Sequence, residues 1–149
     1  MGSASSININ SSCIYISYDY RVKNNVYLKT LLDKLSEMKL NIIYSEVTSE
    51  TLSHLSSHKI SENIKNIMTH TSYFILCVSK ETIRSFHQAI EFDNALNTNK
   101  KILYLMINEC YTPLNNHFVK GIVSKNKWLP FYTDQHVFDT LEYLVDLKL

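Results

Sequence analysis

Tyr73-Phe-Ile-Leu-Cys-Val78 is the stretch of sequence that decides the fold. An apolar run without alternation is typical of a strand at the centre of a parallel sheet, covered by helices on both faces. A second such run, Lys101-Ile-Leu-Tyr-Leu-Met-Ile107, follows after a segment with helical spacing. Two buried strands separated by a helix indicate a βαβ unit and hence the α/β class.

The chain on either side repeats this alternation of strand and helix. Further strands are expected at 13–17, 41–44 and 128–132. Apolar residues at helical spacing predict helices at 26–38, 61–68, 85–96 and 137–145. The last strand is expected at a sheet edge, because Pro130 cannot donate a ladder hydrogen bond. The sequence therefore predicts a flavodoxin-like, doubly wound parallel sheet of five strands with helices on both faces.

Length and composition indicate one globular domain. The chain has 149 residues, of which 45% are hydrophobic and 19% charged, enough to fill a core. We expect a domain over 13–149, preceded by a flexible Ser/Asn-rich arm over 1–12. The net charge of +1 predicts no nucleic-acid partner.

The cysteines and the N-terminus bear on location. Three cysteines without a CxxC pair predict a reducing, cytoplasmic environment. Gly2 followed by Ser6 fits the M-G-x-x-x-[ST] pattern of N-myristoylation, although an initiating Met-Gly-Ser explains these residues equally well. No apolar run is long enough to span a bilayer, so membrane contact is expected only if Gly2 is acylated.

Several ligand sites of doubly wound folds are excluded by missing residues. The chain has two glycines, Gly2 and Gly121, and neither follows an early strand, so it lacks a dinucleotide fingerprint and a Walker A loop. A phosphoacceptor domain needs an aspartate where the third strand ends, but Val78-Ser79-Lys80 stands there. Flavin binding needs a hydroxyl-rich loop after the first strand, where the bulky, charged Tyr18-Asp19-Tyr20-Arg21 lies.

Three polar features remain as candidates: residues 17–21, the polar stretch 45–59 and the helix at 85–96. Ligands of doubly wound sheets bind at the carboxyl ends of the strands, where the first of these features lies. His54 and His58 are spaced i, i+4, but no third ligand has a suitable spacing, so no metal site is predicted.

Several segments, in order, resemble TIR (Toll/interleukin-1 receptor) domains: 14–19, 61–79, 85–96, 102–110 and 128–132. Ile14-Tyr-Ile-Ser-Tyr18 with Asp19 is similar to the family's opening F-I-S-Y-x-x-x-D strand. Ser85 to Leu96 is similar to S-x-W-C-x-x-E-L-x-x-A-L, which puts Glu91 on the family's glutamate. The resemblance covers nearly the whole chain and implies the TIR fold.

The sequence departs from the family pattern at two places. His87 and Gln88 replace the Trp-Cys pair of the third-helix motif. The stretch after the second strand is long and lacks the R-D-x-x-P-G turn that many TIR adaptors use for contacts between domains. Adaptor-style contacts between TIR domains through this loop are therefore less expected for this chain.

The resemblance implies a chemistry, because some TIR domains hydrolyse NAD⁺, or cyclise its ADP-ribose, with that glutamate. Nicotinamide leaves as a neutral molecule, and a carboxylate stabilises the positive charge that develops on the ribose. Glu91 is thus the candidate catalytic residue, with NAD⁺ as substrate and no cofactor. The candidate substrate-binding residues lie near strand ends: Ser17, Tyr18, Asp19, Arg21, Tyr44 and Ser79.

Two functions from different classes remain open. The first is an NAD⁺-cleaving enzyme activated by self-association, and the second is a non-catalytic scaffold that recruits other TIR domains in innate immune-type signalling. From the residues alone, Glu91 and Arg21 are better explained as solvated surface charges than as site residues. Large apolar residues are core candidates first: Phe86, Phe92, Leu96, Trp128 and Phe138.

Overall fold

A computed structural model describes residues 13–44, 57–107 and 127–147. Its five strands form one parallel sheet in the order β2-β1-β3-β4-β5. The strands are β1 (Cys13–Ser17), β2 (Asn41–Tyr44), β3 (Tyr73–Val78), β4 (Lys101–Met106) and β5 (Trp128–Pro130). The two fully apolar strands lie next to each other inside the sheet, and the proline-containing strand lies at an edge. The predicted fold class is confirmed.

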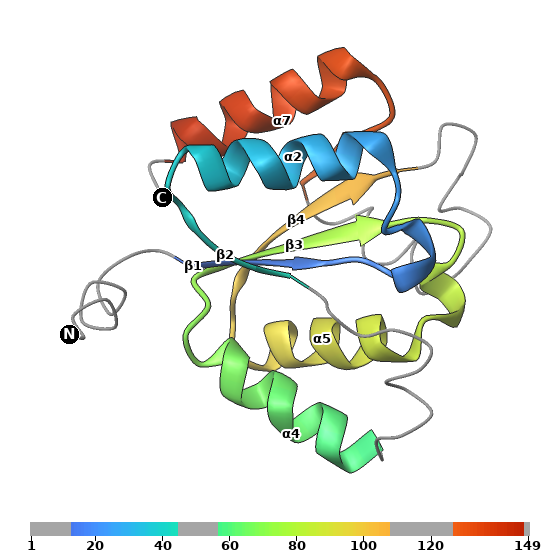
Figure 1. Cartoon of the computed structure of the whole chain (residues 1–149). Coiled ribbons are helices and arrows are strands. Elements are labelled where there is room, and N and C mark those ends of the chain that lie inside the picture. The colour runs from blue at the N-terminus through green and yellow to red at the C-terminus, as the bar shows by residue number, and fades with distance from the viewer. Residues whose placement is uncertain (1–12, 45–56, 108–126, 148–149) are drawn as a thin grey trace.

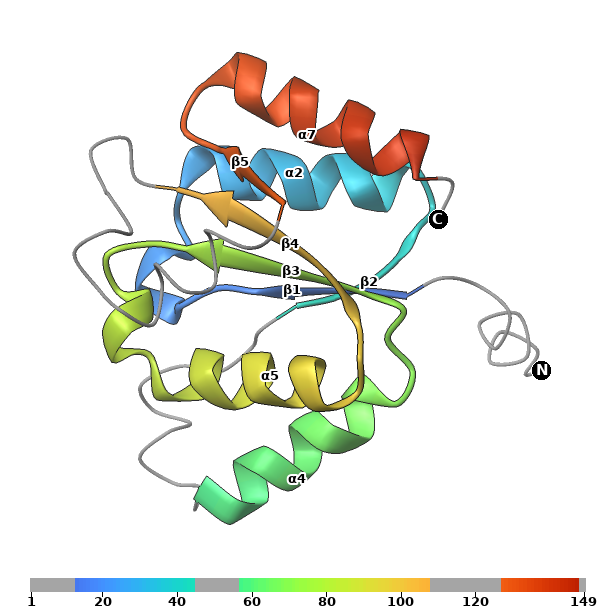
Figure 2. The same cartoon turned by 180° about the vertical axis from the view of Figure 1, so that it is seen from behind.

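Helices cover both faces of the sheet. The described ranges contain α2 (Val26–Glu37), α4 (Ser57–Met68), α5 (Phe86–Asn97) and α7 (Asp134–Asp146), with short 3₁₀ turns η1 (Tyr20–Val22) and η2 (Thr82–Arg84). Helices α2 and α7 lie on one face, and α4 and α5 on the other (Figure 1). The view from behind shows the same layers, with η1 and η2 beyond the carboxyl ends of β1 and β3 (Figure 2).

Alternation along the strands divides the core in two. In β1, Ile14 and Ile16 face α2 and α7, whereas Tyr15 packs with α4 and α5. Full burial of such side chains stabilises the fold by about 1.5–3 kcal/mol each. Ser17 follows Tyr15 by two positions and therefore lies on the α5 side. This alternation determines which β1 side chains face α5.

Side-chain caps fix the starts of three helices. Asn25 Oδ1 accepts hydrogen bonds of 3.0 Å from the backbone N–H groups of Tyr27 and Leu28 at the start of α2. Thr133 caps α7 in the same way, and Ser85 caps α5. Such caps satisfy amide groups that have no partner within the helix.

The structure differs from the sequence-based expectation at several element boundaries, most clearly in α4 and β5. Helix α4 begins at Ser57 rather than Ser61, so the end of the predicted polar stretch is helical. Strand β5 ends at Pro130 rather than Tyr132. The predicted arm over 1–12, with Gly2, and residues 45–56 lie outside the described ranges. None of the described helices combines the length and apolar character that a bilayer-spanning segment requires.

Four of the five predicted core residues are wrong. Phe92 is buried, but four large apolar side chains are about half exposed: Phe86, Leu96, Trp128 and Phe138. In α5 the buried face is formed by residues 87, 88, 91, 92 and 95, so Phe86 and Leu96 fall on the outer side. Apolar character alone does not identify the buried face of a helix that is apolar on several sides.

Candidate active site

Glu91 is a fully buried carboxylate in the middle of the sheet-facing side of α5. One of its oxygens accepts a hydrogen bond from the Tyr15 hydroxyl, and the other accepts a 2.6 Å bond from Ser17 Oγ. Hydrogen bonds to a carboxylate are shorter and stronger than those between neutral groups. A buried charge is costly without such partners, so this carboxylate is held in a defined orientation at the ends of β1 and β3.

Tyr15 is a site residue that the sequence prediction missed. It is only 3% exposed, and its ring stacks on Phe74 of β3 with centroids 5.6 Å apart. The available signal was strand alternation, since Tyr15 and Ser17 are two residues apart and share one face of the sheet. In the sequence-based prediction Tyr15 appears only as part of the family's opening strand motif.

The first turn of α5 is tied to the ends of two strands. His87 is fully buried, and its Nε2 lies 3.0 Å from the carbonyl oxygen of Tyr18. Because a carbonyl only accepts, Nε2 carries the proton in this contact. Gln88 Nε2 donates to the carbonyl oxygens of Ser17 at 3.3 Å and Cys77 at 3.0 Å. The residues that replace the Trp-Cys pair thus connect α5 to the loop and strand ends beside Glu91.

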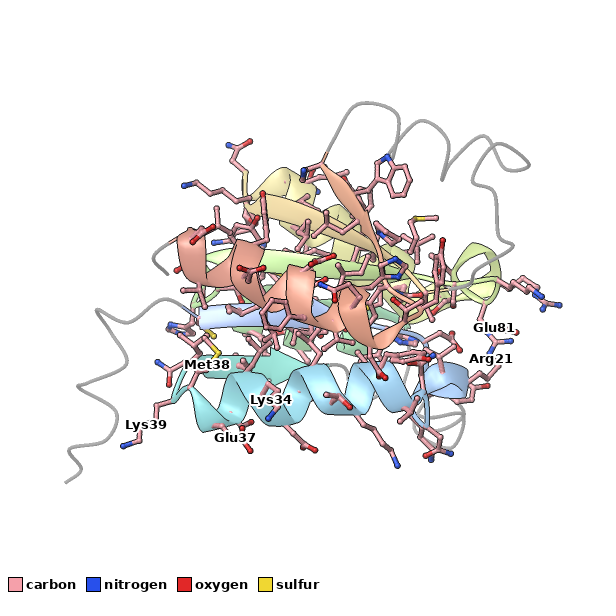
Figure 3. All side chains as sticks on the ribbon, turned by 90° about the horizontal axis from the view of Figure 1, so that it is seen from above. Arg21, Lys34, Glu37, Met38, Lys39 and Glu81 are labelled. Carbon is pink, nitrogen blue, oxygen red and sulfur yellow. The ribbon has the colours of Figure 1, made fainter. Side chains whose placement is uncertain are left out.

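A charged network lies next to this region. Arg21 forms a forked contact with the two oxygens of Asp19 at 2.7 and 3.0 Å, and its Nη1 lies 3.0 Å from Glu81. Arg84 contacts the same Glu81 oxygen at 3.3 Å. Figure 3 shows Arg21 and Glu81 together at one end of the molecule, opposite the end that carries Lys39. The network joins the loop after β1 to the loop after β3.

Asp19 is 1% exposed and carries a pKa below its usual value. Burial alone would raise the pKa, but hydrogen bonds from the Arg21 side chain, the Arg21 backbone and the Ser85 side chain outweigh it. The contact with Asp19 likewise raises the pKa of Arg21. Asp19 is therefore a buried anion whose charge is balanced within the loop.

Replacing Asp19 by Asn is expected to lower the free energy of unfolding at pH 7 by about 1–2 kcal/mol, discounted because Arg21 is partly exposed. A lowered folded-state pKa stabilises the protein above the unfolded-state value of about 4. That contribution is lost as the pH falls through the folded-state value. The gap between the wild type and Asp19→Asn should therefore close below about pH 4 in urea unfolding curves.

The exposed Asp33 on α2 provides the control for this experiment. Asp33→Asn should change the free energy of unfolding by less than about 0.5 kcal/mol at every pH. A gap between the wild type and Asp19→Asn that stays constant from pH 7 to pH 3 would contradict the assignment.

The other predicted binding residues lie at different places. The Tyr18 ring is buried in the cluster that faces α2 and α7, on the other side of the sheet from Glu91. Ser79 is buried after β3, where its hydroxyl accepts a 3.2 Å bond from the Glu81 N–H. Tyr44 pairs with Ile16 at the last position of β2, and its side chain lies outside the described part of the structure.

Glu91 also influences the buried Cys77 on β3. Burial raises the pKa of the Cys77 thiol, and the nearby Glu91 charge raises it further.

An apolar hollow lined by Ala89, Ile90, Phe92, Asp93 and Leu96 lies on α5. Its lining does not include Glu91, so we place the candidate site at the carboxylate, where the polar groups meet.

No metal-ligand set is found in the part of the chain that the structure describes. Within these ranges no three His, Cys, Asp or Glu side chains come together. His54 lies outside the described residues, and so does the side chain of His58.

Comparison with protein families decides the identity of the domain. Residues 15–111 match the family described as Thoeris protein ThsB, TIR-like domain. The chain belongs to this ThsB TIR-like family. The matched segment includes Tyr15, Ser17 and Glu91, so the candidate site lies within the family region of the chain.

Solved structures show the same fold for this ThsB TIR-like domain. The TIR domain of the Toll-related receptor TRR-2 from Hydra magnipapillata superimposes with a TM-score of 0.61 at 14% identity, covering 91% of this chain and 98% of that one. The TIR domain heterodimer of RPS4 and RRS1 gives a TM-score of 0.62 at 8% identity, with coverage of 91% and 97%. At these identities the likeness concerns the fold alone. A comparison with curated proteins found no match.

Proposed function

We propose that this TIR-like domain is an NAD⁺ glycohydrolase that cleaves the bond between nicotinamide and ribose. The observation that carries the proposal is the buried Glu91 carboxylate, oriented by the Tyr15 and Ser17 hydroxyls beside the carboxyl ends of β1 and β3. This edge of a doubly wound sheet is where ligands bind. The TIR family membership adds support, because the resemblance to TIR domains implies a glutamate at this position.

The proposed reaction needs one carboxylate. The bond from ribose C1′ to the pyridinium nitrogen breaks, its electron pair stays with nicotinamide, and nicotinamide leaves uncharged. Glu91 stabilises the positive charge that develops on the ribose. Water then forms the new bond to C1′ and releases a proton, giving ADP-ribose. In the cyclic alternative a nucleophilic atom of ADP-ribose takes the place of water.

The remaining predicted residues receive proposed roles around NAD⁺. Ser17 contacts Glu91 and is proposed to border the nicotinamide ribose, with Tyr44 and Ser79 further along the same sheet edge. The Tyr18 ring is buried on the other face of the sheet, so no side-chain contact with NAD⁺ is proposed for it. Arg21 suits a diphosphate, which guanidinium groups bind bidentately. Asp19 and Glu81 occupy Arg21 in the structure, so a diphosphate would exchange with the more exposed Glu81.

Burial of the catalytic group supports activation by self-association. Glu91 is 0% exposed in the single chain, so a ribose cannot touch it without rearrangement of the surrounding groups. Association of two copies supplies binding energy for such a rearrangement. We therefore propose that activity depends on assembly with other TIR domains.

Incubation of the purified protein with NAD⁺ tests the proposal. Chromatography of the products is expected to show nicotinamide and ADP-ribose, or its cyclic form, in amounts that grow with time. The rate per mole of protein should rise steeply between micromolar and submillimolar protein, because the active form is the assembled one. Absence of nicotinamide at high concentration and on a crowding surface would refute the enzymatic proposal.

A scaffold role is the alternative, and one observation favours it. The RPS4–RRS1 neighbour is a heterodimer of TIR domains, so this fold supports contacts between such domains. Assembly in light-scattering experiments that is the same for the wild type and Glu91→Gln, without NAD⁺ cleavage by either, would favour this second function.

A further inference from the structure

The Gln88 amide bridges two neighbouring strands where their ladder ends. The β1–β3 pairing ends at Ser17 and Leu76. Beyond this point, Gln88 Nε2 donates to the Cys77 carbonyl oxygen at 3.0 Å and to the Ser17 carbonyl oxygen at 3.3 Å. Its third contact is with Ser17 Oγ at 3.4 Å. A single side chain from α5 thus continues the connection between the two strands and reaches the hydroxyl that binds Glu91.

The sequence context would favour a different use of this amide. Ser85 caps α5 and Gln88 follows three residues later, which is the spacing of a capping box. In that motif the glutamine binds the N–H group of the capping residue. Here the Ser85 N–H donates to the Thr82 carbonyl at 3.1 Å instead. Gln88 is therefore released from the helix start and directed to the sheet.

The orientation of the amide is determined by its partners. Gln88 is 1% exposed, and its Oε1 has no hydrogen-bond partner among the described residues. A flipped amide would place this oxygen against two backbone carbonyl oxygens, which only accept. The unpaired buried Oε1 is costly. This orientation of the amide is nevertheless kept, because Nε2 donates to the carbonyl oxygens of Ser17 and Cys77.

We propose that Gln88 is a positioning residue for the catalytic carboxylate, acting through Ser17. By fixing the backbone and hydroxyl of Ser17 at the end of β1, it sets the direction of the 2.6 Å hydrogen bond that Ser17 Oγ donates to Glu91. The catalytic part of this inference rests on the proposed NAD⁺ hydrolase function. The structural part concerns Glu91 alone and is tested without substrate.

Gln88→Met removes the donor while nearly preserving side-chain volume. In protein with ¹³C-labelled glutamate carboxyl groups, the Glu91 resonance is identified by its loss in Glu91→Gln. We expect Gln88→Met to move this resonance in the same direction as Ser17→Ala, which removes the hydrogen bond itself. Asn94→Ala is the matched control on α5. Among the described contacts the Asn94 side chain bonds only to the Ile90 carbonyl, so its removal should leave the resonance in place.

Kinetics provide the second readout. We expect Gln88→Met to lower kcat for NAD⁺ cleavage about 10-fold with little change in KM, because a misdirected carboxylate affects the transition state more than binding. If Gln88→Met fails to fold, Gln88→Asn shortens the side chain and withdraws the donor while keeping the amide.

The outcomes separate this proposal from the proposed function. A lower melting temperature without movement of the Glu91 resonance would show a merely structural role and overturn the inference. Movement of the Glu91 resonance in Gln88→Met would support the positioning of Glu91 even if the wild type never cleaves NAD⁺. In that case the hydrolase proposal alone would be refuted. Unchanged kcat in Gln88→Met, in a protein that does cleave NAD⁺, would overturn the catalytic part.

Discussion

Glu91→Gln is expected to lower the rate of NAD⁺ cleavage by about 100-fold or more, a loss typical of removing one group that stabilises transition-state charge. Gln has nearly the same shape as Glu, and its amide oxygen still accepts from Ser17 Oγ. What it lacks is the negative charge that opposes the developing positive charge on the ribose. Nicotinamide release, followed by chromatography at a protein concentration where the wild type is active, measures the effect.

Asp93→Asn is the matched control for this experiment. Asp93 lies on the same helix two residues later, but it is exposed and faces away from the sheet. Its replacement should leave the rate within about a factor of two, because exposed substitutions rarely disturb a distant site. Equal rates for the wild type and Glu91→Gln would show that Glu91 takes no part in the reaction, provided that circular dichroism shows both proteins to be folded.

Phe74→Ala is expected to have the largest effect on stability. Phe74 is fully buried in the central strand β3, and its ring is stacked on that of Tyr15 at an interplanar angle of 6°. Such a truncation costs about 3–5 kcal/mol, because contacts are lost and a cavity remains. This is a large part of the 5–15 kcal/mol that stabilises a typical domain, and it should lower the melting temperature by about 10 °C.

Phe138→Ala provides the comparison within α7. Phe138 is 57% exposed, so its truncation should change the free energy of unfolding by no more than about 0.5 kcal/mol in urea titrations. Similar losses for the two variants would contradict the assignment of Phe74 to the core and of Phe138 to the surface.

The parallel sheet was predictable because its strongest signals are local. The runs at β3 and β4 are too apolar for any position other than the interior, and Pro130 restricts β5 to an edge. The outward-facing Phe86 and Leu96 were not predictable in this way, since α5 carries apolar residues on several sides. Only the docked helix shows that residues 87, 88, 91, 92 and 95 form its buried face.

The candidate site was predictable only in part, because its polar contacts join distant segments. The family resemblance indicated Glu91 and Ser17, which the structure brings together. It did not indicate Tyr15, whose hydroxyl reaches the same carboxylate, or Gln88, whose amide spans two strand ends. The ring of Tyr18, selected for its place beside Ser17, points to the other face because neighbouring residues of a strand alternate.

The contact between Tyr15 and Glu91 spans 76 positions of the chain. At a synthesis rate of about 5–20 residues per second, Glu91 is made roughly 4–15 s after Tyr15 and Ser17. Contacts of such high sequence separation form late and slow the overall folding rate. The carboxylate therefore acquires its two hydroxyl partners only after α5 has been made and has docked beside β1, so a partly made chain lacks the candidate site.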